Sequence, residues 1–327
     1  LRLLVAAAVC SFAASAAFAQ AAFPNRPIRM ITLTPPGGAL EGFGTFAKAD
    51  YLKAVERAKA LIEAGDFMQV QVGQRIKKRY TESPLSLYRA LRSLNPSPYM
   101  YYYNFGDFQV VGASPEILVR HEHTEAGPKV TIRPLAGTRP RGATPDKDKA
   151  VEQELLADPK ERAEHVMLID LARNDIGRIA KIGSVKVTEA FVVERYSHVM
   201  HLVSNVEGRM RSDLDAVDAL AAGFPAGTLS GAPKVRAMEI INELEKEKRG
   251  VYAGCVGYFS ADGEMDTCIV LRTAIIKDGK MHAQSGAGIV YDSEPAYEHR
   301  ECVNKAMALF RAAEEAVRFA TSARRGQ

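Results

Sequence analysis

The stretch DPKERAEHVMLIDLARND, residues 158–175, holds the pattern from which the rest of the sequence is interpreted. On a helix with 3.6 residues per turn, one face carries positions 161, 164, 168, 171, 172 and 175. Glu161 and Glu164 therefore share a stripe with Leu168 and point toward the start of the core rather than to water. Asp158, followed by proline and Glu161, also fits an ordinary capping box, which leaves a purely structural role open.

A second pair of acidic residues occurs in EPAYEHRECVNKA, residues 294–306. Glu298 and Glu301 are again three positions apart, near the start of another long helix, and their face continues through Cys302 and Lys305. Two helices that each place paired carboxylates beside apolar residues are costly unless a cation compensates them. Mg²⁺ prefers oxygen ligands and usually takes one or two protein carboxylates together with an anionic substrate. The two pairs therefore predict a magnesium site.

Composition excludes several classes of function. The chain has 327 residues, of which 47% are hydrophobic and 25% charged, as in a globular protein with a substantial core. A net charge of +4 without basic runs interleaved with aromatic residues argues against a nucleic-acid partner. The four cysteines have no metal-binding spacing, so we expect buried, unpaired thiols.

The N-terminus differs from the remainder. LRLLVAAAVCSFAASAAFAQ has the basic residue, apolar run and A-x-A site of a secretory signal peptide, and it is too short and alanine-rich to predict a membrane span. The following stretch, FPNRPIRMITLTPPGGA, resembles the mature start of solute-binding proteins of the tripartite tricarboxylate transporter class. We therefore divide the chain into a leader and foreign segment, 1–40, and a catalytic domain, 41–327.

The remaining sequence predicts helices and strands without βαβ alternation. Helical spacing is found at residues 48–64, 148–156, 159–175, 213–222, 233–248 and 294–318. Strand-like runs are found at residues 68–72, 98–103, 109–113, 116–120, 184–194, 198–207, 255–260, 267–276, 280–284 and 287–291. This order predicts an α+β fold with large antiparallel sheets.

Three further features are candidates for anion binding. Gly286-Ala287-Gly288 is interpreted as a turn that follows a short strand, where backbone N–H groups can bind an anion or simply close the turn. Arg272 lies in the otherwise apolar run CIVLRTAII, so it needs an anion, either a substrate carboxylate or an internal acidic partner. Lys305 is a second possible anion contact, or a lysine that extends to the surface.

Two other segments contain candidates for substrate contact. PAGTLSGAPK, residues 225–234, lacks the ending of a P-loop but places Thr228 near the start of a helix. His201 shares a strand face with Val199 and Val203, which is also the pattern of an ordinary core histidine.

From about residue 48 to residue 316 the chain resembles the large, chorismate-using subunits of anthranilate synthases. The motifs that carry the resemblance are AGDFMQVQVGQR, NPSPYMYYY, GASPEILVR, RPLAGTRPRG, ERAEHVMLIDLARND, PAGTLSGAPK, CIVLRTA, GAGIVYDSEP and EHRECVNKA. The resemblance implies a two-layer α/β sandwich with large antiparallel sheets. It implies Mg²⁺-dependent conversion of chorismate to anthranilate and pyruvate, with ammonia supplied by a glutamine amidotransferase subunit, and it allows a heterotetramer with that subunit.

The resemblance also implies roles for individual residues. Glu164 and Glu301 would bind Mg²⁺ directly, while Glu161 and Glu298 would act in the outer shell. Glu161 would also protonate the leaving hydroxyl, and Glu298 or His201 would take the proton from C2. The ring end of the substrate would be contacted by His201 and Thr228. The other substrate-binding residues would be Gly137, Thr138, Tyr252, Arg272, Gly286, Ala287, Gly288 and Lys305.

Two positions separate relatives within this group. Para-aminobenzoate-type synthases carry a nucleophilic lysine where this chain has Ala136, and isochorismate-type enzymes carry a lysine base where it has Gln69. Both differences favour free ammonia as the nucleophile. Relatives usually have a longer N-terminal region that carries half of a tryptophan feedback site, so its replacement here predicts weak tryptophan inhibition.

Alternative interpretations are an aminodeoxychorismate synthase component, a secreted solute-binding protein for carboxylates, and an inactive truncated fusion. The solute-binding interpretation requires a two-lobed βαβ pattern that the chain does not show. The leader argues for export. Because chorismate is a cytoplasmic metabolite, we expect a cytoplasmic protein without a membrane partner.

Overall fold

The computed structural model describes residues 29–33, 48–196 and 199–325, with side chains described from residue 48 to residue 317 except at residues 197 and 198. Most of the expected leader lies outside these ranges, as does Cys10. The other three cysteines are buried and form no disulfide, as the sequence predicts. Within the described ranges, no helix combines the length and the apolar character needed to cross a bilayer.

The first sheet has eight strands, and all of its pairings are antiparallel. Strand β9 pairs with β6 and β7 along one edge and with β8 along the other. In order, the strands are β1 (Arg29–Leu33), β11 (Cys255–Phe259), β12 (Met265–Ile269), β5 (Ile117–Thr124), β6 (Gly127–Ile132), β9 (Val199–Arg209) and β7 (Leu135–Pro140), with β8 (Lys186–Arg195) on β9.

The second sheet has six strands and is also antiparallel throughout. Its longest pairing joins β2 to β14 over ten residue pairs, in which Gly73 lies opposite Gly286. In order, the strands are β10 (Gly231–Ala232), β2 (Gln69–Arg79), β14 (Lys280–Ile289), β13 (Thr273–Lys277), β4 (Gln109–Ser114) and β3 (Tyr99–Asn104).

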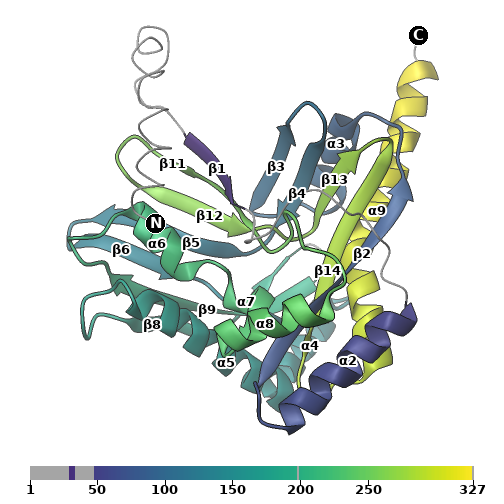
Figure 1. The fold of residues 1–327 in the computed structure, drawn as a ribbon. Coiled ribbons are helices and arrows are strands. Elements are labelled where there is room, and N and C mark those ends of the chain that lie inside the picture. The colour runs from purple at the N-terminus through teal and green to yellow at the C-terminus, as the bar shows by residue number, and fades with distance from the viewer. Residues whose placement is uncertain (1–28, 34–47, 197–198, 326–327) are drawn as a thin grey trace, which may run out of the picture.

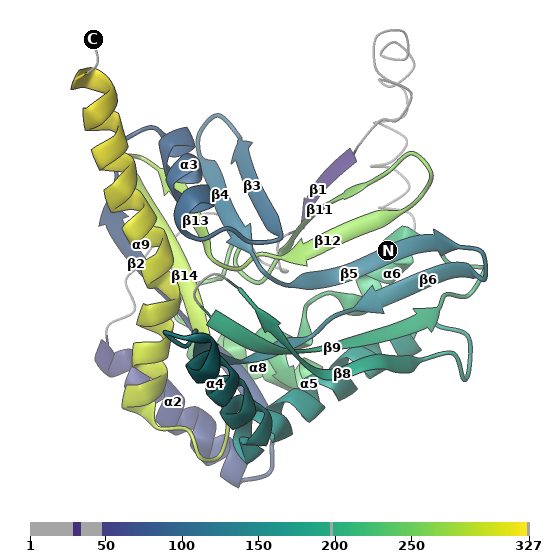
Figure 2. The same cartoon turned by 180° about the vertical axis from the view of Figure 1, so that it is seen from behind.

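Helices cover the outer faces of both sheets (Figures 1 and 2). The long helix α9 (Pro295–Arg325) packs on β14 with α3 (Pro84–Leu94) and α2 (Lys48–Glu63) beside it. On the first sheet, α5 (Pro159–Gly177) packs against β7 and β9, next to α4 (Pro145–Ala157) and α6 (Ala216–Gly223). The short helix α7 (Gly227–Ser230) and α8 (Lys234–Leu244) lie against β2, between the two halves. This arrangement confirms the predicted α+β class with large antiparallel sheets.

The two sheets are joined where the chain passes from one to the other. Residues 114–117 lead from β4 to β5, and residues 269–273 lead from β12 to β13. Three hydrogen bonds hold these crossings together: Ser114 Oγ donates to the Ile269 carbonyl at 2.5 Å, Ile269 N to the Glu116 carbonyl at 3.0 Å, and Ala113 N to the Arg272 carbonyl at 3.2 Å. Beside them a small apolar cluster fills the space between the sheets. Glu116 and Arg272 are thereby brought to one place.

The predicted helices all form, with shifted ends. Two strand assignments differ from the structure, and strands β1, β6, β7 and β10 were not predicted. The strand expected at 267–276 is divided by the crossing at residues 270–272, so Arg272 lies at a bend and not inside a strand. The strands expected at 280–284 and 287–291 are one strand, β14, so the interpretation of Gly286–Gly288 as a turn is wrong. Helix α3 was not predicted, because its apolar positions are separated by serines and begin after a proline.

The start of α5 confirms half of the capping pattern. The Asp158 side chain accepts hydrogen bonds from the backbone N–H groups of Lys160 and Glu161, with Pro159 at the first helical position. The Glu161 carboxylate does not complete a capping box. It accepts a hydrogen bond from Arg139 Nη1 at 2.9 Å, and Arg139 Nη2 also binds Asp158 at 2.7 Å. Arg139 thus fixes the start of α5 to β7.

We expect Gly112→Ala to lower the free energy of unfolding by about 1–3 kcal/mol, the usual cost of overpacking a core. A Cβ at position 112 would lie 2.2 Å from the Tyr101 ring and 2.6 Å from the Thr273 hydroxyl. That ring is held in place, because its hydroxyl is 2.6 Å from Thr273 Oγ1.

The matched control is Gly177→Ala in α5, where nothing lies within 4 Å of the added Cβ. Alanine is the better helix former by up to about 1 kcal/mol, so this variant should be as stable as the parent or more stable. Urea unfolding of both variants measures the difference, and equal stabilities would contradict the packing described at Gly112.

Candidate functional site

The two pairs of glutamates predicted from the sequence lie close to one another in the folded chain. Burial raises the pKa of Glu164, and the negative charges of Glu161 and Glu301 raise it further. Burial likewise raises the pKa of Glu298, to which Glu301 adds. Because the charge of Glu301 acts on Glu164, α5 and α9 bring one carboxylate of each pair into the same region, with its partner one helical turn away.

Each carboxylate nevertheless has a different immediate partner. Glu161 pairs with Arg139, as described above. Glu164 Oε1 accepts a hydrogen bond from Gln69 Nε2 at 3.0 Å. Glu301 Oε1 lies 2.5 Å from Lys305 Nζ, one helical turn further along α9. The site therefore contains more negative than positive charge, and only Lys305 is positioned to balance Glu301 directly.

The chemistry of these groups fits a hard divalent cation. The side chains of the two pairs offer only carboxylate oxygens, which Mg²⁺ prefers. Among the described residues, no group of three or more His, Cys, Asp or Glu side chains forms a complete metal-binding cluster. Mg²⁺ commonly binds through one or two carboxylates and completes its shell with water and substrate oxygens, so two glutamates are a sufficient protein contribution.

Glu116 is a buried acid that the sequence analysis did not single out. It lies on the crossing between β4 and β5, and only 5% of its surface is exposed. Burial raises its pKa to about 8, despite the Thr228 hydroxyl, the Leu135 N–H and the positive charges of Arg272 and Lys305. At neutral pH this carboxyl group is therefore largely protonated and can donate a proton. One sequence signal was present: a single acid next to proline, directly before an apolar run.

Arg272 lies opposite Glu116, on the second crossing. Its backbone has a φ of +46°, a left-handed conformation that few non-glycine residues adopt. Burial lowers the pKa of Arg272, whereas Glu116 and Tyr196 act in the opposite direction. No carboxylate forms an ion pair with its guanidinium in the part of the chain that the structure describes. Glu116 is therefore the internal acid that faces Arg272, although it does not reach ion-pair distance.

His201 and Thr228 complete the side of the site near Glu116. His201 is 2% exposed, and its Nδ1 lies 3.0 Å from the Gly137 carbonyl and 3.1 Å from Thr138 Oγ1. Burial lowers the His201 pKa to about 4, so the ring is neutral at pH 7. If Nδ1 carries the hydrogen and donates to the Gly137 carbonyl, Nε2 is an acceptor, and it is buried without a partner. Thr228 Oγ1, on α7, is likewise buried and makes no regular hydrogen bond.

Backbone glycines allow the polar groups to approach closely. A Cβ at Gly288 would lie 2.6 Å from Gln69 Nε2 and 3.4 Å from Glu164 Oε1, while one at Gly137 would lie 3.2 Å from Glu161 Oε2. Gly137 has a φ of +63° at an irregularity in β7. These positions therefore require glycine both for space and, at Gly137, for backbone conformation.

Strand β14 contributes its backbone to the same region. Lys305 Nζ donates to the Gly286 carbonyl at 3.1 Å, and the Gly286 N–H donates to the Tyr252 hydroxyl. Ala287, between the two glycines in the sequence, is fully buried. The Lys305 side chain keeps 43% of its surface exposed, so its ammonium faces an open space rather than the core.

A small cavity lies behind Glu116 and Thr228. It leaves about 20 Å³ for the centre of a water molecule, which is enough to hold one water. The side of α5 that carries Leu168, Leu171 and Asp175 forms its other wall. The buried acid therefore lies beside a space large enough for one water molecule.

Comparisons with known proteins identify the family of the chain. The family of chorismate binding enzymes matches residues 35–311. Anthranilate synthase component 1 of Cereibacter sphaeroides is 57% identical, with 96% of this chain and 64% of that protein covered. Anthranilate synthase component 1 of Pseudomonas putida is 58% identical, with 88% and 58% covered. The chain thus spans about three fifths of the length of these relatives.

Solved structures share the fold. Anthranilate synthase component I from Streptococcus pneumoniae superposes with a TM-score of 0.74 at 46% identity, covering 86% of this chain and 59% of that one. The menaquinone-specific isochorismate synthase of Escherichia coli gives a TM-score of 0.74 at 24% identity, covering 89% and 64%, which shows the fold alone. The match over residues 35–311, together with the fold and the acidic site, shows that this chain belongs to the family of chorismate binding enzymes.

Proposed function

We propose that this chain is the chorismate-using component of an anthranilate synthase, which converts chorismate and ammonia to anthranilate and pyruvate with Mg²⁺. The observation that carries the proposal is the convergence of two glutamate pairs with Arg272, Lys305 and the protonated Glu116. The two relatives above, both named anthranilate synthase component 1, support the same assignment. We place the catalytic unit in residues 41–327 and, because chorismate is made there, the enzyme in the cytoplasm.

The cations of the site suit a substrate with two carboxylates. Arg272 has a planar fork that can bind one carboxylate through two parallel hydrogen bonds. Lys305, exposed to the same space, contributes a point charge. The backbone of Gly286–Gly288 and the hydroxyl of Tyr252 form the wall next to Lys305. Gly137 and Thr138 hold His201 in place at the opposite end.

Glu164 and Glu301 are the proposed protein ligands of Mg²⁺, with Glu161 and Glu298 close enough to bind its water. When bound, the ion would neutralise the ring carboxylate and draw electron density toward it. Burial and the neighbouring negative charges raise the pKa of both Glu164 and Glu298, so a bound cation would stabilise their ionised forms.

Glu116 is a better general acid than Glu161, the residue first considered for that role. The leaving group at C4 is a hydroxyl, which departs as water only if it receives a proton. Glu161 is paired with Arg139 at 2.9 Å, so its oxygens are already engaged, whereas Glu116 retains its proton at neutral pH. We therefore assign the proton donor to Glu116, next to Thr228.

After ammonia adds at C2, loss of pyruvate requires a base to remove the C2 proton. His201 and Glu298 are the two candidates. The pKa of His201 is lowered to about 4, which makes it a weak base, whereas burial raises the pKa of Glu298. We assign the proton acceptor to Glu298 and a hydrogen-bond acceptor role to His201 Nε2.

The nitrogen source follows from the residues near the reacting carbon. Ala136 is buried in β7, two residues before Thr138, and has no nucleophilic atom. Gln69, which binds Glu164, cannot act as a base toward water. Free ammonia is therefore the proposed nucleophile, and a glutamine amidotransferase subunit is its proposed source.

The test of this function is formation of fluorescent anthranilate from chorismate and ammonium by the full chain, with and without Mg²⁺. Glu301→Gln should lower kcat/KM by about 100-fold or more, since it removes one of only two direct ligands. Glu314→Gln, an exposed glutamate on the same helix that pairs with Lys78, is the control and should behave as the parent. Unchanged activity in Glu301→Gln, or equal rates with Mg²⁺ and with a chelator, would remove the metal from the proposal.

Glu116→Gln tests the proton donor through the pH dependence of kcat/KM. In the parent, kcat/KM should decline as the pH rises through about 8, where Glu116 loses its proton. The glutamine variant should lose about 10²–10⁴-fold in rate below pH 8, the usual contribution of a general acid, and the difference from the parent should shrink as the pH rises above 8.

The stability of the same variant provides an independent readout. The folded-state pKa of Glu116 is raised from 4.5 to about 8, so its contribution is fully present below pH 4.5 and is lost as the pH rises toward 8. Glutamine does not titrate, so the Tm of Glu116→Gln relative to the parent should increase between pH 5 and pH 8. A Tm difference that is independent of pH would mean that Glu116 is not a buried acid.

A further inference from the structure

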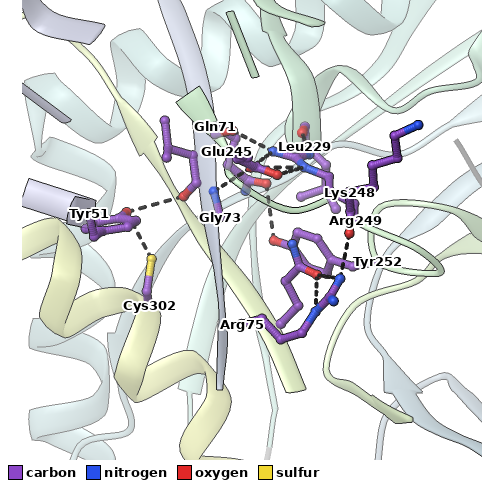
Figure 3. A network of polar contacts seen from close by, with 12 residues as sticks. Tyr51, Gln71, Gly73, Arg75, Leu229, Glu245, Lys248, Arg249, Tyr252 and Cys302 are labelled. Atoms are coloured by element: carbon purple, nitrogen blue, oxygen red, sulfur yellow. Dashed lines mark hydrogen bonds and ion pairs between the residues drawn. The ribbon is translucent and has the colours of Figure 1, made fainter. Parts of the chain in front are cut away.

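Arg249 binds three separate elements with one guanidinium (Figure 3). Its Nη1 donates to the Leu229 carbonyl at 2.5 Å, at the end of α7, and its Nη2 donates to the Gln71 carbonyl of β2 at 2.7 Å. Nε and Nη2 also bind both carboxylate oxygens of Glu245, at 2.6–3.1 Å, just after α8. Leu229 follows Thr228 directly, so Arg249 is one residue away from a side chain of the proposed site.

The carboxylate of Glu245 extends this set of contacts to the backbone of β2. Its Oε1 accepts a hydrogen bond from the Gly73 N–H at 2.7 Å, and a Cβ at Gly73 would lie 3.1 Å from that oxygen. Gly73 lies opposite Gly286 in the sheet. The acid therefore fixes the strand directly beside the glycines that line the site.

Tyr252 is connected to the same arginine. The Arg249 guanidinium carbon lies 5.5 Å from the centre of the Tyr252 ring, within the range of a cation–π contact. The backbone N–H of Tyr252 donates to the Arg249 carbonyl at 3.2 Å, and its hydroxyl donates to Gln71 Oε1 at 3.3 Å. The hydroxyl also accepts the Gly286 N–H. The position of the Tyr252 hydroxyl thus depends on residues 249–252, which Arg249 holds in place.

We propose that Arg249, paired with Glu245, is a positioning residue that fixes Thr228, Tyr252 and the β14 glycines relative to one another. The inference rests on the proposed function for its catalytic consequence, but its geometry stands independently. Only arginine suits the role, because five donors in a rigid plane can reach two carbonyls and a carboxylate together. A lysine has one flexible ammonium and cannot span α7, β2 and Glu245 at the same time.

The experiment must distinguish this positioning role of Arg249 from a role in stability alone. The pair is almost completely buried, with 8% and 5% of the two side chains exposed. Breaking such a pair leaves an uncompensated charge, whereas replacing both members with neutral residues is often tolerated. The informative variant is therefore the double substitution Arg249→Met with Glu245→Gln, measured with Arg249→Met alone and with Arg249→Lys.

We expect Arg249→Met to lose both Tm and activity, and the double variant to recover most of the Tm. Its kcat/KM should stay about 10–100-fold below the parent, the loss typical of a misplaced site. Arg249→Lys should recover Tm more than kcat/KM. In hydrogen–deuterium exchange, the double variant should exchange faster in both segments, 226–232 and 250–256.

The matched control is Arg75→Met with Glu247→Gln. Arg75 is also a buried arginine paired with an acid after α8, and it binds the Lys248 carbonyl and Gln284 Oε1. These hydrogen bonds join β2 to residues 247–248 and to Gln284 rather than to α7, so this variant should lose Tm without a comparable loss of kcat/KM. Parental kcat/KM in the Arg249 double variant, or unchanged exchange in both segments, would overturn the inference. If the parent forms no anthranilate, the proposed function fails, and the exchange comparison alone decides the role of Arg249.

Discussion

The chain crosses from one sheet to the other twice at the same place, and three hydrogen bonds hold the two crossings together. Strand periodicity is interrupted at both, so side chains there are not restricted to the two faces of a sheet. One crossing carries Glu116 and the other carries Arg272, whose left-handed backbone lies in this bend. The two crossings between the sheets therefore place Glu116 and Arg272 beside the same buried space.

Opposite this joint, α5 and α9 place four carboxylates in one region, and their charges oppose folding. The raised pKa values of Glu164 and Glu298 express this cost, since both groups are harder to ionise than in water. Arg139 and Lys305 offset only part of it, because each is bound to one glutamate at its own side of the site. A fold that tolerates such repulsion concentrates strain where a ligand can relieve it, as active sites commonly do.

The sequence predicts those parts of the molecule that depend on periodicity. Helical spacing placed Glu161 with Glu164 and Glu298 with Glu301 on inward faces, and strand-like runs identified most strands but not β1, β6, β7 or β10. It did not locate Glu116, because a single acid before a strand has no periodic signal. It misplaced Gly286–Gly288, because glycines that make room for Gln69 and Tyr252 inside a sheet look locally like a turn. It also did not pair Glu161 with Arg139, since such a partner is set by tertiary packing.

Rigidity of the surroundings explains how so many polar groups remain in fixed positions. The proposed substrate wall lies toward the end of β14, where residues 286–288 pair with residues 71–73 of β2, beyond the part of β14 that pairs with β13. On β2, the Gly73 N–H donates to the Glu245 carboxylate, and the Gln71 carbonyl, two residues earlier, accepts from Arg249. Side chains held by such a second set of buried contacts keep their geometry better than side chains on free loops. The glycines of β2 and β14 thus let polar atoms approach the backbone closely, and Arg249 holds that backbone in position.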